Sequence, residues 1–254
     1  MPEWLQDVLP SDEPVVHTRG VGGVETPPWE KKPFREQSWV VCEGCNHGWM
    51  SKLEGEAKPL LTPAITRSGA CDFDLRAQWI AARWAAKTCY VFQAQAPQLL
   101  APSMHPFLLK ENVKPPQQVT VWLGSHARAV DDPINSVYLQ QPLTLLPDDE
   151  NLKEPVDFGY MGFLAVGGIS FLVVGHRFGN YVECALGQKG EHPAGDMFTK
   201  IWPWSSRVVG WPPCGMMDRE LIDLIFDPDT FPLGFDARVF PGSRLHEPPF
   251  SEAR

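Results

Sequence analysis

The sequence has no excess of basic residues. Lys and Arg total 22 against 31 Asp and Glu, and the formal net charge is −9 at pH 7. A protein that holds nucleic acid over its whole surface is basic, because its Lys and Arg displace counterions from the phosphates. That class is excluded, and any site for DNA must be local. Lys31, Lys32 and Arg35 form the one basic cluster before residue 42. We interpret these three residues first as part of a solvent-exposed face, and the alternative is that they contact phosphate groups.

The sequence also lacks a basic stretch followed by an apolar run at its N-terminus. Such a stretch marks a secretory signal, so we expect a cytoplasmic protein in which disulfides do not persist. Residues 158–175 carry no charge over 18 positions, and about 18 is the shortest length for a spanning helix. Five of these residues are glycine, and the rest are rich in β-favouring types. The run predicts a buried hairpin that turns at Gly167-Gly168, and no contact with a membrane.

A second close pair of cysteines is absent. Of six cysteines, only Cys42 and Cys45 have Cys-x-x-Cys spacing, and Gly44 between them permits a tight turn. Zinc in a structural site takes four ligands, so this pair supplies half of one. The spacing leaves three interpretations, namely half of a zinc knuckle, a redox dithiol, or a turn with two unmetallated thiols. We favour the first, because no thioredoxin-like pattern surrounds Cys42.

The first hundred residues predict helices with short connections. Apolar residues at positions 4, 5, 8 and 9 indicate a short helix that ends before Pro10. A strand-like run at 39–41 leads into the cysteine turn. Ser51 and Glu54 then have the spacing of a capping box, which opens a short helix interrupted by Pro59. A longer helix over 75–95, capped by Asp72 or Asp74, is apolar on two faces and should pack on two sides.

The rest of the chain predicts a sheet. With 26 prolines and 21 glycines, turns should be frequent and long helices few. Strand-like runs, separated by turn signals, lie at 118–123, 136–139, 160–166, 169–174 and 181–186. A helix is predicted over 219–226, followed by a proline-rich tail. We therefore expect an α+β fold, with one domain over 1–66 and an α+β domain of unknown role over 67–254.

The string VCEGCNHGWMSKLEGEAKPLLTPAI, which starts at Val41, resembles the second half of HNH endonuclease-like (His-Me finger) proteins of bacteria and phages. In that family a Cys-x-x-Cys-Asn-x-Gly-Trp-Met segment precedes a similar helix. Residues 1–5 look like the segment that follows the acidic residue and histidine of the family's first half. The resemblance implies a truncated ββα-metal-like N-terminal segment, a linking helix, and a mainly antiparallel sheet with a C-terminal helix.

The resemblance also implies roles for individual residues. Cys42 and Cys45 would be zinc ligands, and Asn46 would be the catalytic residue beside a magnesium or other divalent ion. His47 stands where the family often has a second Asn. We count it as a further metal ligand, which His17 could join.

The family's catalytic histidine and first cysteine pair would precede Met1. We therefore expect a DNA endonuclease of the HNH type with little or no activity as written. Either its true start lies upstream, or it is a degenerate relative. The alternative function is a non-catalytic zinc-knuckle protein that binds nucleic acid or another protein.

Overall fold

The computed structural model describes most of the two predicted segments. The ranges described are 2–9, 15–17, 20–21, 24–25, 29–31, 40–95, 101, 104–111, 118–126, 136–145, 156–176, 182–186, 197–204, 206–212, 215–217 and 235–239. The helical elements are α1 (Leu5–Val8), α2 (Glu43–Cys45), η1 (Asn46–Met50), α3 (Ser51–Thr66), α4 (Leu75–Ala94) and α5 (Met104–Glu111). None of the helices in these ranges has the length and apolar character that crossing a membrane requires.

Strands make up most of the rest of the described structure. The central ones are β6 (Val119–His126), β7 (Ser136–Leu145), β8 (Val156–Val166), β9 (Ile169–His176), β11 (Phe198–Trp202) and β13 (Met216–Met217). The others are β1 (Val15–His17), β2 (Gly20–Val21), β3 (Val24–Glu25), β4 (Trp29–Lys31), β5 (Cys71–Asp74), β10 (Val182–Leu186), β12 (Val208–Trp211) and β14 (Phe235–Val239).

The largest sheet has the strand order β11-β6-β9-β8-β7. Its neighbouring strands are all antiparallel, except that β13 adds a short parallel pairing to β6. The predicted α+β class and antiparallel sheet are confirmed. The strand over 181–186 is confirmed as β10, which pairs with β14 in a separate two-stranded sheet. The predicted helix over 219–226 and the tail lie outside the described residues.

The predicted hairpin is present, with β8 ending at Val166 and β9 beginning at Ile169. Gly167 takes a left-handed conformation with φ 56°, which favours glycine. Residues 159–176 are buried throughout, so both faces of these strands are covered. A strand buried on both faces need not alternate apolar with polar residues. This accounts for the long uncharged run in the sequence.

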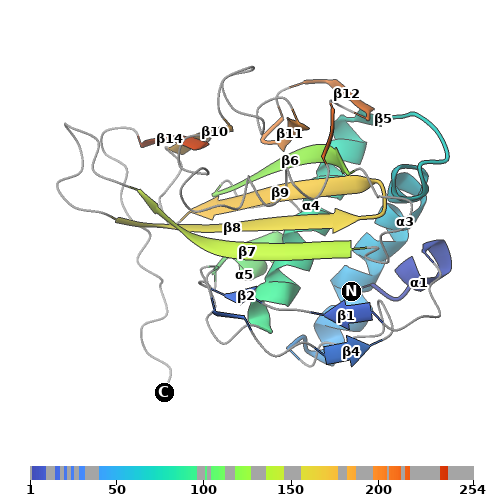
Figure 1. The fold of residues 1–254 in the computed structure, drawn as a ribbon, viewed down its shortest axis with the longest axis horizontal. Helices are drawn as coiled ribbons and strands as arrows, with labels where there is room; N and C mark the ends of the chain where they lie inside the picture. The colour runs from blue at the N-terminus through green and yellow to red at the C-terminus, as the bar shows by residue number, and fades with distance from the viewer. Residues whose placement is uncertain are drawn as a thin grey trace.

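Helix α4 packs against one face of this sheet (Figure 1). Asp74 caps it, with its Oδ1 accepting a hydrogen bond from the amide of Ala77 at 2.7 Å. The ring of Trp84 lies 5.8 Å from that of Phe171 on β9. Residues 80–90 are all buried. The prediction of a long helix packed on two sides is therefore confirmed, because α3 also contacts α4.

Helix α3 continues through Pro59 and Pro63, so the predicted interruption at Pro59 was wrong. A proline inside a helix costs about 3 kcal/mol, because it removes a backbone hydrogen bond and crowds the preceding turn. The buried face of α3 offsets this. Leu53, Leu61 and Ile65 are at most 2% exposed, and burying each such side chain contributes about 1.5–3 kcal/mol.

The core joins the N-terminal segment to the sheet. α1 forms where the sequence predicts a short helix, and Leu5 at its start is fully buried. Leu5, Leu61 of α3 and Phe171 of β9 belong to one cluster of buried apolar residues. The boundary proposed at residue 66 stays a prediction, but hydrophobic packing crosses it.

Candidate functional site

The cysteine turn opens the helical segment that ends in α3. Cys42 is extended (φ −65°, ψ 150°) and caps α2, with its Sγ accepting a hydrogen bond from the Cys45 amide at 3.3 Å. The Cys42 carbonyl accepts from the amides of Cys45 and Asn46 at 3.1 and 3.0 Å. The two cysteines are not in disulfides, and Cys42 is exposed. Residues 40 and 41 form a turn and a bend, so the strand predicted at 39–41 is absent from them.

These contacts lower the pKa of the Cys42 thiol. The side chain of Cys45, and then its backbone N–H, hydrogen-bond the Cys42 sulfur and lower the pKa of its thiol. Burial, and then the charge of Asp72, raise the pKa of the Cys71 thiol. A thiolate is both the nucleophile and the metal ligand of a cysteine. The turn therefore favours the ionised form that a metal would bind.

The metal-free protein should show this difference in its alkylation by iodoacetamide. At pH 7 a lowered pKa gives Cys42 a larger thiolate fraction, so Cys42 should be labelled several times faster than Cys71. The difference should shrink as the pH rises towards about 9, where ordinary thiols ionise too. Mass spectrometry of peptides after brief labelling measures both rates. Faster labelling of Cys71 at pH 7 would contradict the assignment.

The other predicted site residues fall in different places. Asn46 and His47 are exposed and begin the wide helical turn η1, which is kinked at Gly48 (φ −92°, ψ −112°). Lys31 ends strand β4, and His17 ends β1 and pairs with Trp29. Lys32 and Arg35 lie outside the described residues. In the part of the chain that the structure describes, no three His, Cys, Asp or Glu side chains gather as metal ligands.

Glu54 does not complete a capping box. Its Oε2 accepts hydrogen bonds from the indole N–H groups of Trp4 at 2.6 Å and Trp84 at 2.9 Å. Its Oε1 accepts from the ammonium group of Lys87. The side chain of Lys87 is 7% exposed and that of Glu54 is 18% exposed. Glu54 thus ties α1, α3 and α4 together, whereas Ser51 makes no cap to α3, whose N-cap residue is Met50.

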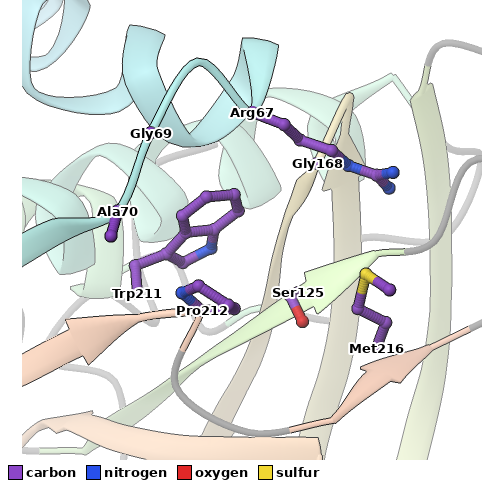
Figure 2. A pocket seen from close by; sticks show the side chains of 8 residues that line it. All are labelled: Arg67, Gly69, Ala70, Ser125, Gly168, Trp211, Pro212 and Met216. Atoms are coloured by element: carbon purple, nitrogen blue, oxygen red, sulfur yellow. The ribbon is translucent and has the colours of Figure 1, made fainter.

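Sequence reasoning missed a pocket of about 320 Å³ beyond the C-terminal end of α3. Its walls come from the turn after α3, the end of β6, the β8–β9 turn and the loop between β12 and β13 (Figure 2). Arg67, Ser125, Trp211 and Met216 line it. These residues are far apart in sequence, and no motif connects them. Only the tertiary fold brings them together.

The pocket and the cysteine turn are separate sites. The turn precedes α3, and the pocket begins at Arg67, directly after it. The 16 residues of α3 span about 24 Å at about 1.5 Å per residue. A ligand in the pocket therefore does not contact Cys42 or Cys45.

No known protein family, curated protein or solved structure matches this chain.

Proposed function

We propose that this chain is a divalent-metal-dependent DNA endonuclease of the HNH type and that, as written, it cleaves little or no DNA. The observation that carries the proposal is the cysteine turn. Two thiols are three residues apart, one accepts an amide hydrogen bond, and the turn leads directly towards a 16-residue helix. This order of elements is the one that the resemblance of the segment from Val41 onward implies.

The residues present can supply two of the four ligands that a structural zinc ion takes. Cys42 and Cys45 are free thiols at a suitable spacing, and hydrogen bonding favours the thiolate of Cys42. Bound zinc would stabilise the turn. Asn46 follows it, exposed to solvent, and is the residue we assign to the catalytic ion. A divalent ion there would stabilise the charge that develops on a phosphate during hydrolysis.

Metal analysis of freshly purified native protein tests the zinc site. We expect zinc to be present, to be lost in a Cys42→Ser/Cys45→Ser double variant, and to be retained in Cys71→Ser. Cys71 is the matched control, because it is half-buried and lies outside the turn. Elemental analysis that finds no zinc in the native protein would remove the basis of the proposal.

Plasmid nicking with Mg²⁺ tests the chemistry. We assign no general base among the residues of this site, and a general base contributes about 10²- to 10⁴-fold to catalysis, so we expect little or no nicking by this chain. Any nicking observed should fall in Asn46→Ala and persist in Lys52→Gln, an exposed change on the same helical segment. Nicking unchanged by Asn46→Ala would show that the role of Asn46 is wrong. Zinc and DNA binding that Mg²⁺ does not alter, before or after Asn46→Ala, would favour the non-catalytic zinc-knuckle function.

A further inference from the structure

The pocket at the end of α3 has walls that hydrogen bonds hold in place. The Gly168 amide donates to the Ile65 carbonyl at 2.9 Å, which joins the β8–β9 turn to α3. The hydroxyl of Ser125 donates to the Gly215 carbonyl at 2.9 Å, which joins β6 to the loop before β13. The guanidinium of Arg67 donates to the His126 carbonyl. The cavity is therefore formed before any ligand enters, as ligand sites usually are.

The described part of the lining is mostly apolar and carries one positive charge. Trp211 ends β12, Met216 begins β13, and Pro212 directly follows Trp211 (Figure 2). Among the described residues of the lining, Arg67 is the one that carries a charge. A guanidinium has five N–H donors in a planar fork that suits carboxylates. An apolar wall beside a fixed guanidinium favours a ligand that has an apolar body and an anionic end.

Trp211 supplies a second observation. Trp211 is only 6% exposed, and its indole N–H has no hydrogen-bond acceptor within the described ranges. A buried donor without an acceptor costs about 1–3 kcal/mol. Figure 2 shows the indole nitrogen on the side of the ring that faces Ser125. An acceptor oxygen on a ligand would satisfy this donor.

We propose that this pocket binds a small aryl carboxylate. The aryl ring packs against Trp211 and Met216, where a thioether and an aromatic ring both attract it. The carboxylate faces Arg67. The volume of about 320 Å³ lies at the lower end of the roughly 300–1,000 Å³ range of ligand pockets, so one ring and one short substituent fit. An aromatic ring and a carboxylate also occur together in a free aromatic acid and in an aromatic residue at the C-terminus of a peptide.

Titration of the ¹⁵N-labelled full chain with benzoate tests this proposal, with shifts of the indole N–H signals as the readout. A Trp211→Phe variant assigns the signal of Trp211. We expect saturable shifts of that signal with a Kd of about 1 mM or tighter, as suits a ligand of this size. Benzamide, which has the same shape without the charge, should bind at least tenfold more weakly. The absence of saturable shifts with benzoate, or equal binding of benzamide, overturns the proposal.

Substitutions at Arg67 test the role of its charge. Arg67→Gln should weaken benzoate binding at least tenfold, and Arg67→Lys should retain most of it. Lys52→Gln is the matched control, because it removes one exposed positive charge in the first turn of α3, at the end away from the pocket. Binding should change less than twofold. If Arg67→Gln fails to fold, Met216→Trp tests whether benzoate occupies the pocket, and the comparison with benzamide tests the charge. Met216 is 59% exposed, so a larger ring there should block the pocket without disturbing the core. Undiminished binding in the folded variant overturns the proposal.

A third titration separates the two sources of the ligand. N-acetylphenylalanine has an amide on its α-nitrogen, a benzyl side chain and a free α-carboxylate. It therefore resembles a C-terminal phenylalanine of a peptide. Binding at least as tight as that of benzoate supports a peptide C-terminus, and weaker binding supports a free acid. If thymidine monophosphate displaces benzoate and binds the pocket more tightly, the assignment to a carboxylate ligand is overturned.

Discussion

Replacing Glu54 with alanine should lower the free energy of unfolding by about 3–5 kcal/mol. The substitution leaves the ammonium of Lys87 buried without its carboxylate and removes the acceptor of two indole N–H groups, those of Trp4 and Trp84. An unpaired buried charge is among the few single changes with so large an effect. Urea denaturation of the native and variant proteins measures the difference.

Two further variants show whether burial causes the loss. The Lys58–Asp7 ion pair also joins α3 to α1, at 3.2 Å, but its side chains are 45% and 72% exposed. Asp7→Ala should therefore change stability by at most about 1 kcal/mol. A Glu54→Leu/Lys87→Met double variant should recover much of the loss, because apolar pairs often replace buried ion pairs without penalty. Equal effects of Glu54→Ala and Asp7→Ala would show that Glu54 is not a buried anchor.

Replacing Gly167 with alanine should destabilise the protein by about 2–4 kcal/mol. A Cβ at this position would lie 2.3 Å from the Ile65 carbonyl oxygen, and φ is 56°. Both the left-handed backbone and the overlap with α3 therefore oppose a side chain. The turn would have to move away from α3, which also displaces Gly168 from the wall of the pocket. Urea denaturation gives the loss of stability, and the indole N–H signal of Trp211 reports the pocket.

Gly55→Ala is the matched control for this change. A Cβ on Gly55 would meet no atom within 4 Å, and the residue lies inside α3. Alanine stabilises a helix interior by about 1 kcal/mol relative to glycine, so this variant should be more stable than the native protein. A Gly167→Ala variant as stable as Gly55→Ala would rule out the close packing of the β8–β9 turn on α3.

The sequence predicts well those parts of the fold that local signals determine. Asp74 before an apolar run marks the start of α4, and adjacent glycines mark the β8–β9 turn. It predicts poorly where tertiary contacts outweigh local preference. Pro59 has a strong local preference against helix, but the buried face of α3 outweighs it. Ser51 and Glu54 have capping-box spacing, but Glu54 binds partners 30 to 50 residues away.

The candidate sites divide in the same way. Spacing alone identifies Cys42 and Cys45 as candidate zinc ligands, because both lie within one turn. The pocket contains Arg67, Ser125 and Trp211, whose proximity depends on how α3, β6 and β12 pack. No local pattern carries that information. A pocket assembled from distant segments becomes visible only once the tertiary structure is known.

The long sequence separations around Glu54 bear on how the protein folds. The hydrogen bonds from Trp4 and Trp84 join residues 50 and 30 positions apart. Closing such loops loses chain entropy before any contact compensates for it, so we expect these bonds to form late in folding. Interactions absent from the transition state act mainly on the unfolding rate. We therefore expect the hydrogen bonds of Glu54 to slow unfolding of the protein more than they speed its folding.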